Sequence, residues 1–443
     1  MPYLPLPQSG PFTKEDGEQV IDGQGQRVMI FRPWSRTARA RRYSTMRERS
    51  AVEVLLAFLK LGLTSFGGPI AHLGYFREEI VVRRRWIDDP AYTDLVALCQ
   101  FLPGPASSQV AFSLGLIRAG YRGALAAWVG FTFPSAVLMM TFALGAGSLT
   151  GPLGTGTLHG LKLVAVAIVA QAVWGMARTL CPDRTRACIA AIAAVLILSS
   201  SGSSSIQIVV ILLGGLGGLW LCRSNSSVSA GILVAPVSRR VGVICLSTFI
   251  ALLIGLPLVR ADGPCPGVAL FDAFYQSGAL VFGGGHVVLP LLRNAVVAPG
   301  WVSDNVFLAG YGAAQAIPGP LFTFAAYLGA IVKPPPHGIL GAALGLVAIF
   351  LPGTLVLLAT LPFWNTFRSR RGAQAVMRGI NAAVVGILGA ALYSPVWVSS
   401  VHNAADVSVA IIGFLLLTAL QAPPIVVVLM GAVVGIAMSA SAS

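Results

Sequence analysis

The chain has 443 residues, of which 56% are hydrophobic and only 10% are charged, with a mean hydropathy of +0.79. Because soluble domains carry about 25% charged residues, this composition excludes a soluble protein and predicts an all-helical polytopic membrane protein. The formal net charge is +14, and the Lys and Arg residues lie mostly in the N-terminal tail and in short loops, as in the cytoplasmic flanks of spanning helices. We therefore expect the lipid bilayer, and not nucleic acid, to be the partner of these charges.

The basic tail over residues 1–50 differs from the rest of the chain. It contains no apolar run that could serve as the core of a cleavable secretory signal. Its composition predicts disorder.

The apolar part of the chain is an internal repeat. The stretch from Phe58 to Pro69 returns past the midpoint as the stretch from Phe274 to His286. Further anchors pair, in the same order, Trp86 with Trp301, Asp89 with Asp304, Gln100 with Gln315, Pro103-Gly104-Pro105 with Pro318-Gly319-Pro320, Pro134 with Pro352, and Gly160 with Gly379. The predicted organisation is a tail over 1–50, a first repeat over 51–222, a linker with one extra span over 223–264, and a second repeat over 265–443.

Apolar stretches of about the length needed to cross a bilayer, roughly 20 residues, occur in both halves. The first half contains 124–146, 158–177, 187–200 and 206–221. An extra span follows at 241–259, and the second half contains 339–361, 380–398, 407–420 and 425–438.

Two other segments in each half have Gly and Pro at their centres, 52–76 and 91–117 with their partners 269–292 and 306–332. Proline removes an intrahelical hydrogen bond and glycine adds backbone freedom, so each segment should form two short helices around a break. Arg-rich loops beside the first-half segments favour re-entrant hairpins that enter and leave on the cytoplasmic side, with full crossings as the alternative. Whether the segments are hairpins or full crossings, an odd number of crossings separates the two repeats. The second half is therefore predicted to be inverted, as in transporters that alternate access around a midplane site.

The sequence around these breaks resembles the chromate ion transporter (CHR) family in its long, two-domain form. The motifs that carry the resemblance are Phe66-Gly67-Gly68-Pro69, Arg85-Trp86-Ile87, Leu102-Pro103-Gly104-Pro105, the stretch from Phe282 to Pro290, and the stretch from Gly310 to Phe324. The resemblance covers the chain from about Val52 onward. It implies a multi-pass protein of the inner (plasma) membrane that exports chromate, with sulfate as the look-alike anion, driven by the membrane potential or a proton gradient. Whether the protein forms a homodimer is left open.

One departure from the family pattern follows the first Pro-Gly-Pro. Members associated with chromate resistance commonly carry an acidic residue there, whereas this chain has Ala106-Ser107-Ser108. The substrate or the energetics could therefore differ.

The breaks themselves predict the anion site. A half-helix that begins after a break directs unsatisfied N–H groups and the positive end of its dipole toward the membrane centre, which suits a dianion. The alternative is that Gly and Pro only permit close helix packing. The candidate substrate-binding residues are Ser65, Phe66, Gly67, Gly68, Gln100, Gly104, Ser107, Gly283, Gly284, Gly285, His286, Gln315, Gly319, Thr323 and Lys60.

Titratable residues in the broken segments are candidates for coupling. His286 abuts the Gly-rich break and His72 is similarly placed in the first half, so each could bind a proton or simply pack. Lys60 lies at a depth where a charge is usually functional, with snorkelling as its alternative, and Lys162 near a helix end is expected to snorkel. Asp94 is the third coupling candidate, with a solvated carboxylate as its alternative.

No enzyme signature is present. The sequence lacks His-Glu-x-x-His, Gly-x-Ser-x-Gly and Walker A patterns. Its six cysteines form no Cys-x-x-Cys pair, so neither a metal nor another cofactor is expected. The prediction is a secondary chromate exporter, with a transporter of sulfate or another oxyanion in either direction as the first alternative. The second is a membrane scaffold or intramembrane enzyme whose breaks serve packing.

Overall fold

The computed structural model describes residues 18–21, 27–30, 50–66, 68–146, 151–200, 204–222, 236–262, 266–282, 285–364 and 370–442. The chain divides into two units, Met1–Arg49 and Ser50–Ser443. In the first unit, β1 (Glu18–Ile21) pairs antiparallel with β2 (Arg27–Ile30). This hairpin is an exception to the all-helical prediction. The disorder expected for the rest of the tail concerns residues outside the described ranges.

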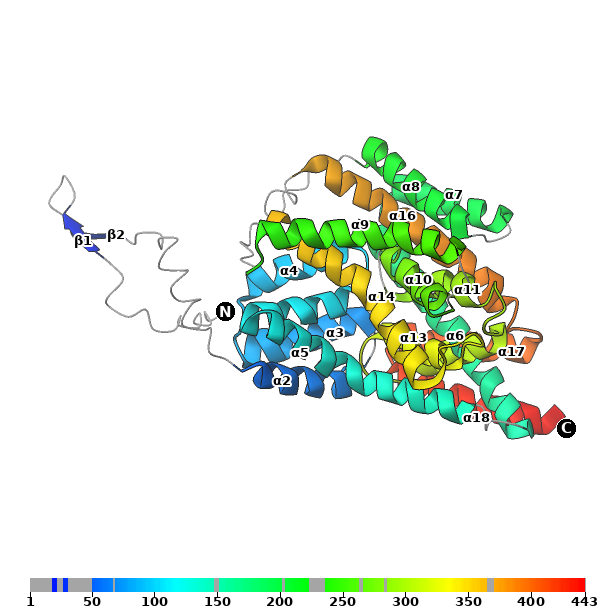
Figure 1. Ribbon diagram of the computed structural model, residues 1–443. Coiled ribbons are helices and arrows are strands. Elements are labelled where there is room, and N and C mark those ends of the chain that lie inside the picture. The colour runs from blue at the N-terminus through cyan, green and yellow to red at the C-terminus, as the bar shows by residue number, and fades with distance from the viewer. Residues whose placement is uncertain are drawn as a thin grey trace, which may run out of the picture. The chain divides into compact units, whose positions relative to one another are not determined.

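The described elements of the second unit are helical (Figure 1). The first half contains α2 (Ala51–Thr64), α3 (Gly68–Phe76), the π-helical turn η1 (Arg77–Arg83), α4 (Asp89–Phe101), α5 (Ala106–Ala146), α6 (Gly151–Leu180), α7 (Arg184–Ser199) and α8 (Ser204–Leu221). The single helix α9 (Arg239–Asp262) follows. The second half contains α10 (Pro266–Ala279), η2 (Gly285–Val287), α11 (Val288–Val296), α12 (Asp304–Ala314), η3 (Leu321–Thr323), α13 (Phe324–Ile331), α14 (Gly338–Thr360), η4 (Leu361–Phe363), α16 (Arg371–Ala391), η5 (Leu392–Trp397), α17 (Ala404–Thr418) and α18 (Pro424–Ala442).

Helix α5 consists of two arms joined by a sharp turn. Ala119 has φ −140° and ψ 27°, and Gly120 has φ 64°, so neither is helical. The arms pack so closely that a Cβ atom at Gly115 would overlap the carbonyl oxygen of Gly123. The arms correspond to α13 and α14, which a short loop joins in the second half. The order of elements is therefore the same in both halves.

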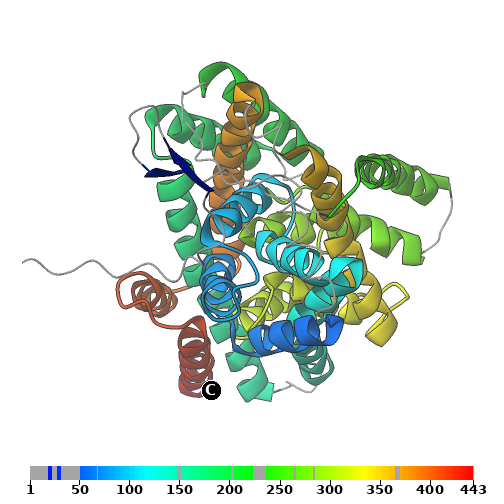
Figure 2. The same cartoon turned by 90° about the vertical axis from the view of Figure 1, so that its left-hand side faces the viewer.

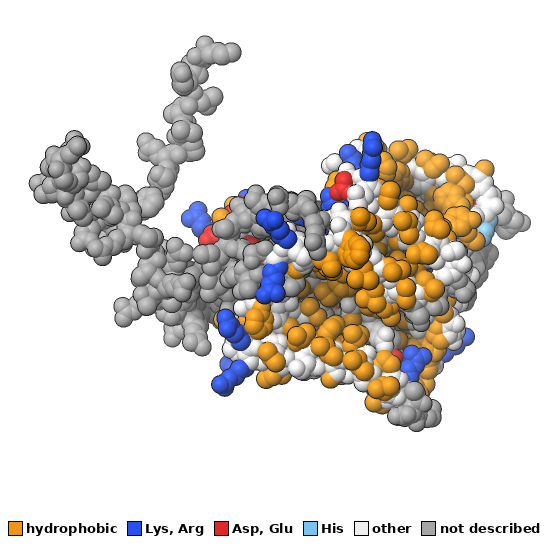
Figure 3. Space-filling model, turned by 90° about the horizontal axis from the view of Figure 1, so that it is seen from above, with side chains coloured by type: hydrophobic (Ala, Val, Ile, Leu, Met, Phe, Trp, Pro, Cys, Tyr) orange, Lys and Arg blue, Asp and Glu red, His pale blue; other side chains and the backbone are white. Residues whose placement is uncertain are grey.

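Five of the described helices are long and apolar enough to cross a membrane, over 106–145, 154–180, 239–260, 338–363 and 371–397. Shorter apolar helices cover 206–221, 321–331, 404–418 and 424–439. Figure 3 shows a face rich in hydrophobic side chains, with Lys and Arg mostly at its margins. Such a surface is suited to contact with lipid tails.

In each half, the first of the last three helices packs against the last two helices of the other half. Helix α6 packs against α17 and α18, whereas α16 packs against α7 and α8, and Figures 1 and 2 both show α16 alongside α7 and α8. The backbones touch at glycines, since a Cβ at Gly160 would overlap Gly431, and one at Gly379 would overlap Gly214. Small residues permit such close approach, which drives helix association in lipid. The two halves are thus held together by swapped helices.

A repeated salt bridge further relates the halves. Arg77 Nε lies 2.6 Å from Asp89 Oδ1, and Arg293 Nη2 lies 2.7 Å from Asp304 Oδ2. Asp89 and Asp304 are matched anchors of the sequence repeat, and each begins the helix that leads to a Pro-Gly-Pro. Each bridge joins the residue just after the first broken segment of its half to the first residue of the helix that leads to the Pro-Gly-Pro.

Candidate functional site

The four predicted breaks are present in the structure. Each lies between one helix and a second helix that begins directly after it, namely α3, α5, α11 preceded by η2, and α13 preceded by η3. The first N–H groups of a helix have no intrahelical partner, so each start presents donors and a partial positive charge to its break. Of the predicted site residues, Gly67, Gly283 and Gly284 lie outside the described ranges.

Two reciprocal backbone hydrogen bonds join the breaks of opposite halves. Gly104 N donates to Val281 O at 2.7 Å, and Gly319 N donates to Ser65 O at 2.9 Å. Each Pro-Gly-Pro therefore contacts the Gly-rich break of the other repeat. Because η2 also packs against η3, the two joined pairs lie together, and the four breaks meet at one place although they are distant in sequence.

Residues from α5 and α14 close around this junction. Ser135 Oγ donates to Pro318 O at 2.6 Å, and Gln109 Nε2 donates to both Pro103 O (2.8 Å) and Gly353 O (2.9 Å). Ser135 and Gly353 each follow the matched prolines of the repeat. Sequence reasoning missed Gln109 and Ser135. Their position next to a matched motif was the available signal.

Several buried polar groups at the junction have no hydrogen-bond partner in the described structure. Those that can donate are Ser65 Oγ, Ser108 Oγ and Gln315 Nε2, and the acceptor Gln109 Oε1 also lacks a partner. The Ser65 side chain is wholly buried. A buried donor left without a partner costs roughly 1–3 kcal/mol. Such groups are suited to donating to an oxyanion.

The two predicted histidines also lie at the breaks. His72 Nδ1 is 3.4 Å from Ser107 Oγ. The centroid of the His72 ring lies 5.3 Å from that of the Phe131 ring, in an edge-to-face arrangement. His286 Nδ1 is 2.7 Å from the Tyr311 hydroxyl. Each ring is held by a hydroxyl from another helix. Tyr311 was missed because its position opposite His286 depends on how α12 packs.

The remaining predicted residues lie in varied surroundings. Thr323 Oγ1 donates to Pro320 O at 2.8 Å, within its own turn. Gln100 is exposed on α4, so its position differs from that of the partly buried Gln315. Phe66 is partly buried, and Asp94 is buried rather than solvated. Contact of these residues with an anion or proton stays a prediction.

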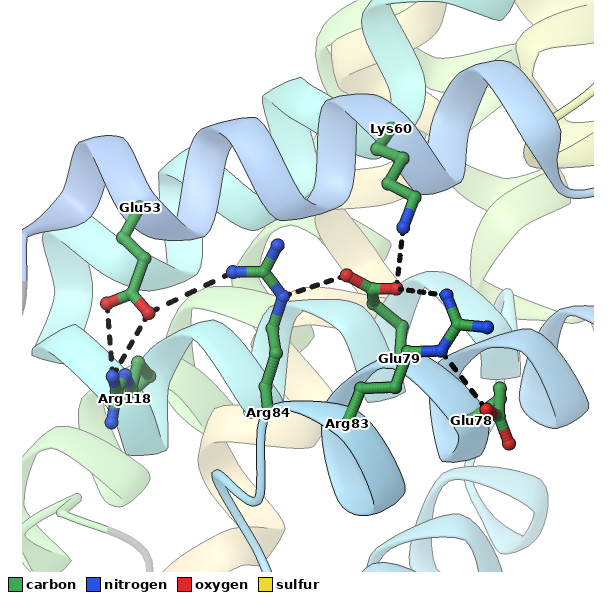
Figure 4. A network of polar contacts seen from close by, with 7 residues as sticks. All are labelled: Glu53, Lys60, Glu78, Glu79, Arg83, Arg84 and Arg118. Atoms are coloured by element: carbon green, nitrogen blue, oxygen red, sulfur yellow. Dashed lines mark hydrogen bonds and ion pairs between the residues drawn. The ribbon is translucent and has the colours of Figure 1, made fainter.

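Lys60 lies in an ion-pair network (Figure 4). Its Nζ is 2.8 Å from Glu79 Oε2, and Arg84 Nε is 2.9 Å from Glu79 Oε1. Glu53 extends the network by pairing with Arg84 at 3.9 Å and with Arg118 at 3.0 Å. The network ties α2 to η1 and to the first arm of α5. The charge of Lys60 is thus already paired with Glu79. Contact between Lys60 and the anion stays a prediction.

Replacing Glu79 by glutamine is expected to destabilise the protein by about 2 kcal/mol, because a buried carboxylate loses charge-assisted hydrogen bonds. Burial raises the pKa of Glu79, but hydrogen bonds from Lys60 and Arg84 outweigh this and place it below the usual 4.5. The stabilisation is therefore present above pH 4.5 and is lost as the pH falls through the lower folded-state pKa. Thermal unfolding of the detergent-solubilised protein measures it. Glu78→Gln is the control, because Glu78 is half exposed, and an equal effect of both variants would contradict the prediction.

Among the residues that the structure describes, no three His, Cys, Asp or Glu side chains gather closely enough to hold a metal ion. The junction of the breaks consists of backbone groups, hydroxyls, amides and imidazoles.

Comparison with known proteins gives the context for this geometry. The model of the chromate transporter family matches residues 52–219 and again residues 268–436. The chain belongs to the chromate transporter family. Two copies of the family domain occur in tandem, which confirms the long form, and membership of a transporter family implies membrane transport rather than catalysis.

Relatives of the chain include proteins named as chromate transporters. The chromate transport protein of Pseudomonas aeruginosa is 27% identical over 76% of this chain and 79% of its own length. That of Cupriavidus metallidurans is 27% identical over 77% of this chain and 81% of its own length. An uncharacterised transporter of Methanocaldococcus jannaschii is 24% identical over 81% of this chain and 88% of its own length. No solved structure matches the chain.

Proposed function

We propose that this protein is a secondary transporter that exports chromate across the inner (plasma) membrane and binds the dianion where the four breaks meet. The observation that carries the proposal is the pair of reciprocal hydrogen bonds, Gly104 to Val281 and Gly319 to Ser65. Together with the packing of η2 against η3, they bring four helix starts to one junction between the halves. Helix N-termini favour anions through their free N–H groups and dipoles.

The side chains at the junction support an anionic substrate. Ser65, Ser108 and Gln315 supply buried polar groups without partners, and His72 and His286 add imidazoles that can donate a hydrogen bond. These five side chains carry no negative charge. A chromate dianion would receive charge-assisted hydrogen bonds, which are stronger than neutral ones.

The proposed membrane arrangement keeps the inverted repeat. The broken segments are re-entrant hairpins, and the second half is upside down relative to the first. Support comes from the loops, because Arg83, Arg84 and Arg85 fill the first-half loop whereas 294–304 contains no Lys or Arg. Alternate opening of the junction to each side would then move the anion, driven by the membrane potential or a proton gradient.

A sulfate transporter is the second candidate. Ser107 and Ser108 follow the first Pro-Gly-Pro, and neutral hydroxyls can donate to any tetrahedral dianion. Chromate and sulfate share shape and charge, so the geometry of donors does not separate them.

Uptake of labelled chromate and labelled sulfate into inside-out vesicles tests the proposal. Chromate is expected to accumulate, to be competed by sulfate, and to accumulate faster under an imposed gradient. Vesicles without the protein are the control. Accumulation of sulfate but not chromate would favour the second candidate, and no flux of either anion from a folded protein would overturn both.

A further inference from the structure

A second polar cluster lies where α6, α12 and α17 meet. Asp406 of α17 is wholly buried, and its Oδ1 lies 2.7 Å from His159 Nε2 of α6. Its other oxygen, Oδ2, accepts from His402 N at 2.9 Å, while Asn403 Oδ1 caps the helix by accepting from Asp406 N. The carboxylate is therefore fixed by the start of α17 and directs one oxygen at the imidazole. The contact joins the two halves.

Lys162 lies one helical turn beyond His159, and its position corrects the expectation that it snorkels. It is 8% exposed, and its Nζ donates to Asn305 Oδ1 at 3.1 Å and to Ser399 O at 3.2 Å. Both of these partners are neutral. The negative charges of Asp406 and Asp304 also act on it. A buried ammonium in a membrane helix is costly and usually functional.

The charges that face this cluster come from each neighbouring element. On α6 they are His159 and Lys162, on α17 Asp406, and before α17 His402, whose ring stacks on that of His159 at 6.3 Å. On α12 the charge is Asp304, which Arg293 of α11 holds through two hydrogen bonds of 2.7 Å. The sequence of α18 contains no ionisable side chain. With His159 and His402 both neutral and the other four groups ionised, the cluster has no net charge, so one added proton gives it a charge of +1.

Helix α12 connects the cluster to the junction of the breaks. It begins at Asp304 and Asn305 and ends beside Gln315, and it carries Tyr311, the partner of His286. A Cβ atom at Gly312 would overlap the backbone of Leu161, so α12 and α6 are in direct backbone contact. A shift of α12 along α6 would change the surroundings of Lys162 and of His286 together.

The His159 side chain is itself 26% exposed, and a cavity with Arg293 in its wall lies near the cluster. It has a volume of about 270 Å³, and its wall includes Arg293, Asn294, Gln207, Ser200 and Ser394. Several water molecules fit in such a volume. Arg293 connects the cavity to Asp304, the residue next to the Asn305 that binds Lys162.

We propose that His159 and Asp406, with Lys162 beside them, form the proton-binding site that couples a proton gradient to anion movement. The step is the transfer of one proton from water to the imidazole, which then forms an ion pair with Asp406. This weakens the attraction between Asp406 and Lys162 and leaves a positive charge beside α12. The proposal rests on the proposed function and adds the coupling ion and its site.

Proteoliposomes that contain the full chain and a trapped pH-sensitive dye test the proposal. In the wild type, net chromate flux is expected to be accompanied by proton flux. Asp406→Asn and His159→Gln are each expected to reduce proton flux and gradient-driven chromate uptake at least tenfold. Both should keep exchange of labelled for unlabelled chromate, which requires no net proton transfer. Asp183→Asn is the matched control, because Asp183 caps α7, the counterpart of α17, at an exposed position, and it should behave like the wild type.

The outcomes separate the coupling site from the proposed function. Wild-type proteoliposomes that move neither chromate nor sulfate would overturn the function, and with it the coupling. Wild-type chromate flux without proton flux, or variants that exchange chromate and keep full proton flux, would overturn the coupling site alone. If Asp406→Asn fails to fold, His159→Gln decides the question, because it leaves the cap of α17 intact.

Discussion

Replacing Gly319 by alanine is expected to reduce chromate flux by at least about tenfold, a barrier change of roughly 1.4 kcal/mol or more. Gly319 has φ +96°, a conformation that costs an L-residue roughly 1–3 kcal/mol. A Cβ atom there would also overlap Ser135 Oγ. The substitution would displace the second Pro-Gly-Pro from Ser135 and from Ser65, whose carbonyl accepts the Gly319 N–H. Uptake into vesicles, normalised to the amount of inserted protein, measures the loss.

Gly338→Ala is the matched control for this variant. Gly338 also has a positive φ, +64°, but a Cβ atom there would meet no neighbour within 4 Å. It should therefore retain most of the flux despite its own backbone strain. The reciprocal variant Gly104→Ala should behave like Gly319→Ala, because a Cβ atom at Gly104 would lie 2.9 Å from Gly353 Cα. Equal flux in the Gly319 and Gly338 variants would contradict the importance of the junction.

Replacing Ser65 by alanine is expected to weaken chromate binding tenfold or more while leaving stability unchanged or slightly increased. The Ser65 hydroxyl is buried without a partner, so its removal breaks no hydrogen bond within the described structure. In the complex it would donate to a dianion, and a hydrogen bond to a charged group contributes about 1.5–3 kcal/mol. The concentration dependence of uptake measures the affinity, and thermal unfolding without chromate measures the stability.

Ser277→Ala is the control for Ser65→Ala. Ser277 is also buried, but its Oγ donates to Ala273 O of its own helix at 2.7 Å. We expect its affinity for chromate to match that of the wild type. Unchanged affinity in Ser65→Ala, or an equal loss in Ser277→Ala, would mean that the Ser65 hydroxyl does not bind the anion.

The positions of the breaks could be predicted from sequence because their causes are local. Proline lacks the N–H that a helix requires, and glycine permits positive φ, as at Gly104 and Gly319. The repeat could also be predicted from the sequence, since its matched residues recur in the same order in both halves. Both features therefore depended on residue type and spacing alone.

The surroundings of individual side chains were less predictable. Lys60 and Lys162 are both lysines in apolar helices, yet one is paired with Glu79 at a half-exposed position and the other is buried against Asn305. Gln100 and Gln315 occupy matched positions, but only Gln100 is exposed. A long side chain meets whatever helix packs beside it, so its role depends on tertiary contacts.

The sequence by itself determined the helices, the four breaks and the two-fold repeat, because hydrophobicity and the backbone limits of Gly and Pro act over short distances. Only the tertiary structure decided that Gly104 meets Val281 and that Gly319 meets Ser65. These contacts, like the packing of Gly160 on Gly431, join residues that lie far apart in the chain. They depend on how two whole repeats dock, which is set by the summed fit of many small residues.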